Sequence, residues 1–363
     1  MSYPTVKLKD ISLIKTGKLD SNAAVADGVY PFFTCDPNTL RINDWAYDTE
    51  AVLLAGNNAS GNYTAKYYKG KFNAYQRVYI IETADAERLN TRYLCYAMNQ
   101  QLRLLKTMSS GSTTKFLTLG MLHGLDIPLP VIEVQDSIVT ILSSYDDLIE
   151  NNQKQIKLLE EVAQRLYKEW FIDLRFPGHE TTPIVDGVPE GWAWGTLADI
   201  ALFRRGKTIT KDQVKAGIIP VVAGGLEPAY YHDTPNTNAP VVTVSGSGAN
   251  AGFTRMYHTK VWASDCSYID AAVTKNTAWV YCFLKGNKAS IDAMQKGAAQ
   301  PHVYAKDLNA MKALFPDDKL MEQFRVIADP MFTRIGKLDM QIKRLAEARD
   351  RLLPKLMSGE IEV

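Results

Sequence analysis

Hydrophobic residues recur at intervals of three and four positions in two long segments of the chain. The first series lies at Ile138, Ile141, Tyr145, Leu148, Asn152, Gln155, Leu159, Val162 and Leu166, with two polar members. The second series repeats the spacing at Phe324, Ile327, Met331, Ile335, Leu338, Ile342, Leu345 and Leu352. Such a period is typical of a coiled-coil seam. It predicts two long helical regions, at 132–172 and 317–363.

Each predicted helix is too long to be covered by one small domain. A helix of about 40 residues extends roughly 60 Å at 1.5 Å per residue, so its apolar stripe needs a long partner. We expect the two helices to pair with each other as an antiparallel intramolecular coiled coil, with Asn152 and Gln155 fixing the register. The alternative, in which each helix lies on its own globular domain, stays open at this point.

The remaining segments have the pattern of mixed α and β domains. Short apolar runs rich in β-branched and aromatic residues, at 51–55, 77–81, 239–244 and 260–263, are separated by Gly/Asn turns and predict strands. Residues 90–108 have helical spacing, and Thr91 is placed to cap that helix. The sequence therefore predicts globular domains at 1–131 and 192–316, joined after the first helix by a linker at 173–191 that is rich in Pro and Gly.

An internal repeat relates the two halves. Near the start, Leu8, Asp10, Ile11, Gly17, Lys18 and Pro31 reappear at one constant offset as Leu197, Asp199, Ile200, Gly206, Lys207 and Pro220. Within the helices, QIKLLEEVAQRL (155–166) matches QIKRLAEARDRL (341–352) at an offset three residues smaller. The length difference lies inside the globular part, so the ends of the repeats match better than their middles. The predicted fold class is α+β, with the order globe, helix, globe, helix.

Composition narrows the function only slightly. With 46% hydrophobic and 22% charged residues, the chain has the composition of a globular protein. It has no uncharged apolar run suited to a signal peptide or a membrane span, so we expect a cytoplasmic location without membrane contact. The four cysteines are far apart and indicate neither a metal site nor disulfides. The net charge of +1 lacks the usual basic signature of nucleic-acid binding, so any DNA contact must come from local patches.

Several motifs resemble catalytic elements but lack the context that the chemistry needs. ALFRRGKT (201–208) is a loose nucleotide-binding loop without the glycines that wrap phosphates, and its repeat counterpart SLIKTGKL lacks the hydroxyl residue. SGSGANAG (245–252) is followed by a strand-like segment where a dinucleotide loop would open a helix. PDDK (316–319) is read most simply as a helix cap. We therefore expect a non-catalytic chain without a cofactor, with an enzyme built on Gly-Lys-Thr or PDDK as the weaker alternative.

Candidate DNA contacts lie where cations alternate with aromatic residues and where a loop changes its chemistry between repeats. Basic-aromatic segments can offer phosphate and base-edge contacts together. The candidates of this kind are Lys66, Tyr67, Lys69, Lys71, Gln76 and Arg77 in the first repeat, and Arg255, His258 and Lys260 in the second. The loops 111–118 and 297–304 add Ser112, Thr113, Thr114, Lys115, Gln300 and His302, and the 201–208 segment adds Arg204, Arg205 and Lys207.

Five segments in the right order give the chain a family resemblance. They are IPLPVIEVQ (127–135), RLYKEWFIDLRFPG (165–178), PEGWAWGTLADIA (189–201), AQPHVYAKDL (299–308) and RLLPKLMSGEI (351–361). Together they resemble the specificity subunits of type I restriction–modification systems. The resemblance implies two target-recognition domains that each read half of a bipartite double-stranded DNA site, and paired helices that set the spacer. It also implies docking of two methyltransferase subunits and of motor–nuclease restriction subunits, which hold the cofactors.

One difference between the repeats concerns their ends. The second helix lacks the aromatic exit RLYKEWF of the first, and Pro354 is expected to shorten it. We therefore expect partner docking to be imperfectly symmetric. The main rival from another class of function is a coiled-coil adaptor that binds only protein.

Overall fold

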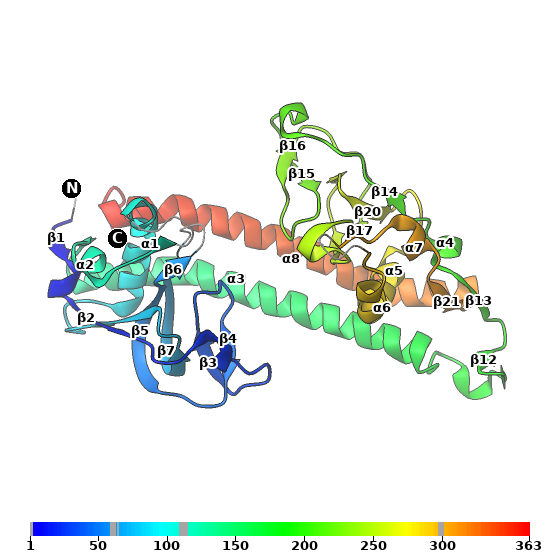
Figure 1. The fold of residues 1–363 in the computed structure, drawn as a ribbon, viewed down its shortest axis with the longest axis horizontal. Coiled ribbons are helices and arrows are strands. Elements are labelled where there is room, and N and C mark those ends of the chain that lie inside the picture. Colours follow the sequence, from blue (N-terminus) through cyan, green and yellow to red (C-terminus); the bar gives the residue numbers. More distant parts are fainter. Residues whose placement is uncertain (1–2, 59–62, 64, 109–114, 297–300) are drawn as a thin grey trace. The chain divides into compact units, whose positions relative to one another are not determined.

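The computed structural model describes residues 3–58, 63, 65–108, 115–296 and 301–363. Contacts divide the chain into unit 1, Met1–Ile149 with Arg344–Val363, and unit 2, Glu150–Lys343. Both divisions fall inside long helices, since α3 runs Ile132–Tyr167 and α8 runs Asp318–Ser358 (Figure 1). The two long helices confirm the elements predicted from periodicity. The domain ranges expected from the sequence stay a prediction, because each compact unit combines a globular part with portions of both helices.

Unit 1 is built on a six-stranded sheet in the order β2-β8-β5-β7-β3-β4. Its strands are β2 (Ser12–Thr16), β3 (Tyr30–Phe33), β4 (Leu40–Ile42), β5 (Tyr47–Ala55), β7 (Ala65–Ala74) and β8 (Val78–Thr83). Alternate residues of β5 face opposite cores: Val52 and Leu54 pack in one cluster, Ala51 and Leu53 in another. Two short pairs join β1 (Thr5–Lys7) to β10 (Asp126–Pro128) and β6 (Asn57–Asn58) to β9 (Lys115–Phe116).

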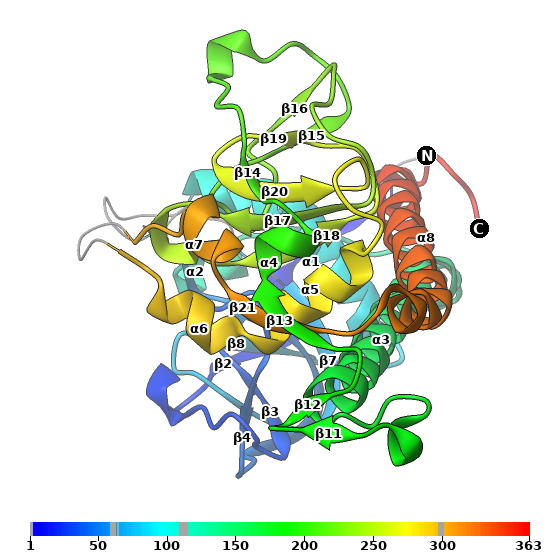
Figure 2. The same cartoon turned by 90° about the vertical axis from the view of Figure 1, so that its right-hand side faces the viewer.

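Unit 2 repeats this strand order in two smaller sheets, β14-β20-β17-β18 and β16-β15-β19 (Figure 2). Their strands are β14 (Arg204–Arg205), β15 (Ile219–Val222), β16 (Tyr230–His232), β17 (Val241–Ser245), β18 (Thr254–Tyr257), β19 (Trp262–Ala263) and β20 (Cys266–Asp270). β18 and β19 together occupy the place that the single strand β7 has in unit 1. Further pairs are β13 (Ala193–Thr196) with β21 (Lys312–Phe315), and β11 (Ile184–Val185) with β12 (Val188–Pro189). The repeat is thus present in the topology.

Shorter helices cover the sheets and shape the loops. They are α1 (Thr91–Met108), α2 (Leu119–His123), α4 (Leu197–Ile200), α5 (Thr277–Gly286), α6 (Lys288–Ala293) and α7 (Ala305–Asn309). Single turns of 3-10 helix lie at Leu8–Asp10, Ser21–Ala23, His179–Thr181, Lys211–Gln213 and Gly248–Asn250, and a π-helical turn lies at Lys168–Ile172. The cap predicted at Thr91 is wrong by one residue. The side-chain oxygen of Asn90 accepts from the N–H groups of Arg92 and Tyr93, at 2.9 and 3.1 Å.

The two long helices run antiparallel and share apolar cores inside each unit (Figure 1). In unit 1, Ile138 of α3 belongs to the same buried cluster as Leu356 and Met357 of α8. In unit 2, the corresponding cluster joins Ala163 to Phe324. The predicted pairing is therefore confirmed.

The predicted seam is wrong in detail. Leu148 and Val162 of the predicted series are 50% and 48% exposed, while Leu142 and Ala163, which lie outside the series, are buried. Asn152 is buried, as the series predicts. The buried stripe follows the globular domains as well as the partner helix, and that second contact moves it around the helix axis. Pro354 also does not shorten α8, which continues to Ser358.

Each long helix also packs on a globular part, so the two expectations for its partner both hold. In unit 1, the Tyr96 hydroxyl of α1 donates to the Asp146 carboxylate of α3 at 2.5 Å. Arg349 of α8 donates to the other oxygen of that carboxylate at 2.7 Å. Three helices are thus tied together at one acidic side chain.

Candidate nucleic-acid interface

In unit 1, three loops that are far apart in the sequence meet at the end of β5. The backbone N–H of Gly56 donates to the Arg77 carbonyl at 2.7 Å, and the N–H of Leu117 donates to the Gly56 carbonyl at 2.8 Å. Asn58 pairs with Lys115 in the short β6–β9 ladder. We call this group, Gly56–Asn58, Gln76–Arg77 and Lys115–Leu117, loop cluster 1. It brings together three of the predicted DNA contacts, Gln76, Arg77 and Lys115.

Unit 2 has the same arrangement at the end of β17. The N–H of Gly246 donates to the Asp265 carbonyl at 3.2 Å, and the N–H of Val303 donates to the Gly246 carbonyl at 3.1 Å. Ser247 forms a β-bridge with His302, and its hydroxyl donates to the Asp265 carboxylate. We call Gly246–Ser247, Ser264–Asp265 and His302–Tyr304, with Arg205 beside them, loop cluster 2. Of these residues, Arg205, Gly246, Asp265 and His302–Tyr304 line a small hollow of about 30 Å³.

The same backbone hydrogen bonds hold the loops together in both clusters. The side chains at the rim of each cluster, which are exposed or half-buried, differ between the two repeats. In cluster 1 the rim carries the exposed Gln76 and Arg77. In cluster 2 it carries the exposed Arg205 and the half-buried His302, whose ring stacks on Tyr304 with centroids 5.9 Å apart. Arg, Lys and Gln can make directional hydrogen bonds to base edges. Loops on a rigid scaffold are the usual place for binding residues.

Lys66 and Arg255 occupy equivalent positions and hold an equivalent loop. Lys66 lies opposite Leu53 in the β5–β7 ladder, and its ammonium donates to the Asp36 carbonyl at 3.4 Å and to the Thr39 hydroxyl at 3.3 Å. Burial lowers the pKa of Lys66.

Arg255 lies opposite Thr243 in the β17–β18 ladder, and its guanidinium donates to the Leu226 carbonyl at 2.9 Å. In each repeat, therefore, a cation fastens the loop that follows the first strand of the β3–β4 or β15–β16 hairpin. This contact gives both predicted residues a local partner.

The other basic residues of β7 also have local partners. Lys69 forms an ion pair with Glu50 at 2.9 Å, and the Lys71 ammonium lies 4.6 Å from the centroid of the Trp45 ring. The Tyr67 hydroxyl donates to Glu50 at 2.9 Å, and burial together with this hydrogen bond raises the pKa of Tyr67 to about 12. Exposed pairs of this kind are weak, so Lys69 and Lys71 can still exchange their partners for phosphate.

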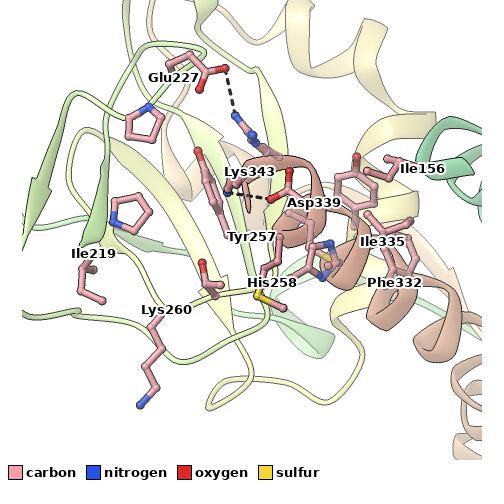
Figure 3. A pocket seen from close by; sticks show the side chains of 18 of the residues that line it. Ile156, Ile219, Glu227, Tyr257, His258, Lys260, Phe332, Ile335, Asp339 and Lys343 are labelled. Atoms are coloured by element: carbon pink, nitrogen blue, oxygen red, sulfur yellow. Dashed lines mark ion pairs between the residues drawn. The ribbon is translucent and has the colours of Figure 1, made fainter. Parts of the chain in front are cut away.

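His258 and Lys260 lie, with Arg255, along a hollow of about 570 Å³ between β18 and α8 (Figure 3). The hollow carries both signs of charge, because Glu227 is 3.8 Å from Arg255 and Asp339 pairs with Lys343 at 2.9 Å. Most of its lining is apolar, from residues such as Phe332 and Ile335 of α8. A hollow with charges of both signs and a largely apolar lining is better suited to side-chain packing than to binding a phosphate backbone.

The shared Gly-Lys element is a close approach of two backbones. A Cβ at Gly17 would lie 2.2 Å from the Ala74 carbonyl oxygen, and one at Gly206 would lie 2.2 Å from the Ser264 oxygen. Only glycine fits there, which explains its presence in both repeats. The Lys207 side chain is exposed, as are Arg204 and Arg205 of β14. ALFRRGKT thus contains the short strand β14, followed by the close backbone approach at Gly206.

The other two doubtful motifs also have structural roles. SGSGANAG ends β17 and passes through a 3-10 turn at Gly248–Asn250 into β18, so it opens no helix. Asp317 caps α8 by accepting from the N–H of Leu320 at 2.9 Å. Over the described ranges, no group of three or more His, Cys, Asp or Glu side chains is arranged to hold a metal ion.

Some predicted contacts cannot be placed, and one residue was missed. Ser112, Thr113, Thr114 and Gln300 lie outside the described residues. Asp265 sits in loop cluster 2 but was not predicted, since it belongs to no basic or aromatic run. Aligning the repeats at Gly56 and Gly246 would have found it.

The described cysteines and helices add two observations. The four cysteine thiols are free, and burial raises the pKa of both Cys95 and Cys266 to about 12. In the part of the chain that the structure describes, none of the helices has the length and apolarity needed to cross a bilayer.

Comparison with known proteins shows which proteins this chain is similar to. Residues 2–161 match the family described as "Type I restriction modification DNA specificity domain". The fold, with its two repeats and two long helices, is shared with a crystal structure of the type I restriction–modification S subunit from M. genitalium. That superposition has a TM-score of 0.64 at 17% identity and covers 98% of this chain and 96% of the other. At this identity the likeness concerns the fold alone.

Sequence relatives make the assignment more particular. The EcoDI specificity subunit of Escherichia coli is 32% identical over 227 residues, which are 55% of this chain and 50% of that subunit. The MjaIX specificity subunit of Methanocaldococcus jannaschii is 28% identical over 296 residues, 75% of this chain and 68% of that subunit. The match to the EcoDI subunit thus spans half its length. These matches confirm the resemblance to type I restriction enzyme specificity subunits that the sequence predicts.

Proposed function

We propose that this chain is the DNA-reading subunit of a type I restriction–modification enzyme. Each repeat reads one half of a bipartite, asymmetric double-stranded site through its loop cluster. The observation that carries the proposal is the common backbone frame of clusters 1 and 2, in which Arg77 and Phe116 are replaced by Asp265 and His302. Two domains that recognise different base sequences can share the backbone that positions them on DNA. They need different side chains at the base edges.

The partners follow from the proposed class. Two methyltransferase subunits supply the methyl transfer, and restriction subunits supply translocation and cleavage, so this chain itself carries no catalytic step and acts in the cytoplasm. The exposed apolar side chains on the long helices, Leu148, Leu158, Val162 and Val326, offer contact surface for such subunits. The same surface would serve a protein-binding adaptor, the alternative from another class.

One experiment separates these functions. The chain is expressed with a methyltransferase partner in a host without other DNA methylation, and methylated bases are mapped across the genome. The proposal expects one bipartite motif. Random or absent methylation, with an intact protein complex, would favour the adaptor.

Variants in cluster 1 test which half-site it reads. Arg77→Ala and Lys115→Ala are expected to weaken one half of the motif by ~1–3 kcal/mol and to leave the other half unchanged. Equal loss on all sequences would restrict these residues to phosphate contacts. Asp20→Ala, on the surface of the same repeat, is the matched control.

The paired helices are proposed to set the spacer. Seven residues inserted into each helix, after Ile149 in α3 and after Lys343 in α8, keep the heptad register and lengthen the pair by about 10 Å at 1.5 Å per residue. With 3.4 Å per base pair, the preferred spacer should grow by about three base pairs while both half-sites persist. An insertion in α3 alone serves as the control, because it puts the contacts between the two helices out of register. An unchanged spacer in the double insertion would contradict the ruler.

A further inference from the structure

Arg77 and Asp265 occupy the same place in the two repeats. Each supplies the carbonyl that accepts from the glycine at the end of the central strand, Gly56 or Gly246. The next residue begins the same ladder in each case: Val78 pairs with Ala55, and Cys266 pairs with Ser245. One backbone position therefore carries a cation in repeat one and a carboxylate in repeat two.

The surroundings of Asp265 are those of a positioned hydrogen-bond acceptor. The Ser247 hydroxyl donates to one carboxylate oxygen and fixes the side chain. Asp265 is half-buried and lines the small hollow of loop cluster 2 together with Arg205 and His302. The guanidinium of Arg205 reduces the repulsion between a carboxylate and the phosphates of bound DNA.

A carboxylate cannot contact phosphate favourably, so its use at this surface must be a different one. In the major groove, Asp and Glu accept hydrogen bonds from the exocyclic amine N4 of cytosine, whereas Arg donates to O6 and N7 of guanine. The reversal of sign between Arg77 and Asp265 is then a reversal of the base that each can read. A hydroxyl that donates to the carboxylate leaves its remaining lone pairs free for a base amine.

We propose that Asp265 is a specificity-determining residue that accepts a hydrogen bond from a cytosine amine in the half-site read by repeat two. This assignment rests on the proposed function. Arg77 is its counterpart in repeat one, where the same position selects guanine.

The test compares methylation motifs of variants in the complex with the methyltransferase partner. Asp265→Asn keeps the shape and one oxygen but introduces an amide donor. It is expected to lower the preference for cytosine at one position of the second half-site by about 10-fold or more, with the first half-site unchanged. Ser247→Ala removes the fixing hydroxyl and should weaken the preference without changing the preferred base. Asp212→Asn, at an exposed aspartate of the same repeat, is the matched control and should leave the motif unchanged.

The possible results distinguish this assignment from the function on which it rests. A bipartite wild-type motif that Asp265→Asn leaves unchanged, or weakens equally at all positions, overturns the role of Asp265 alone. A wild-type complex without any motif overturns the proposed function and this assignment with it. Asp265→Glu, which keeps the charge, guards against misfolding: it should retain the cytosine preference in part. Loss of that preference in a folded Asp265→Asn complex counts for the proposal, whereas equal loss in a folded Asp265→Glu complex counts against it.

Discussion

Replacing Gly336 by alanine should destabilise unit 2, although alanine is the better helix former. Gly336 lies in the middle of α8 and faces the segment that links β18 to β19. A Cβ at this position would lie 2.6 Å from Cβ and 2.7 Å from Cγ of His258. Carbon atoms pack favourably at about 3.5–4.0 Å, so α8 and this linking segment would have to separate by roughly 1 Å. His258 cannot swing away, because its Cβ is fixed to the backbone.

Two opposing effects set the size of the change. Helix propensity favours alanine over glycine by ~1 kcal/mol. Overpacking of a filled site costs ~1–3 kcal/mol, and here it also disturbs the packing of His258 on the Phe332 ring, with centroids 6.5 Å apart. The clash should win, and the free energy of unfolding should fall by ~1 kcal/mol.

The assay combines urea unfolding, followed by circular dichroism, with amide hydrogen exchange in the α8 portion of unit 2. Gly286→Ala is the matched control, because the nearest atom to its Cβ is a Tyr167 ring carbon at 3.9 Å. In the double variant His258→Gly/Gly336→Ala the clash is gone, so its loss should be smaller than the sum of the two single losses. A Gly336→Ala protein that is more stable than wild type by ~1 kcal/mol would refute the close contact.

Three further predictions concern titration, an ion pair and the loop contacts. Burial lowers the pKa of His258 below 6.5, so the stability of unit 2 should fall as the pH drops below about 6.5, where the unfolded chain takes up the proton first. His258→Asn should flatten that slope in urea titrations at pH 7.5 and 5.5. Asp146→Asn should lower the stability of unit 1 by ~1–2 kcal/mol, and a double-mutant cycle with Arg349→Met should give a coupling near ~1 kcal/mol. Lys66→Met and Arg255→Met should raise hydrogen exchange in the loops they hold without altering the preferred bases; a changed motif would make them base readers.

The helices and most strands could be predicted because their signals are local. Periodicity found both long helices, and β-branched runs found β5, β8 and β17. The exact seam was not accessible, since a stripe shared between a partner helix and a globular domain is wider than a two-stranded seam. That is why Leu148, a heptad position, is exposed.

The candidate site could be predicted only in part from the sequence, because backbone contacts between distant segments bring its residues together. Gly56, Arg77 and Leu117 carry no shared motif, yet two hydrogen bonds join them. In the sequence, DNA contacts were predicted where cations alternate with aromatic residues. That pattern selected Lys66 and Arg255, whose charges the structure uses to hold neighbouring loops.

The backbone contacts of the two loop clusters suggest how the DNA preference of the proposed function could change during evolution. The frame consists of N–H to carbonyl contacts centred on Gly56 and Gly246, and these contacts do not depend on the side chains at the rim. In the proposed function, a substitution at Arg77 or Asp265 therefore alters the group offered to DNA without removing a backbone hydrogen bond that holds the loops. Because the two clusters lie in separate compact units, a change in one leaves the other's contacts intact. Under the proposed function, the repeat would thus allow each half-site to diverge alone, and opposite charges at one backbone position are the expected result of that independence.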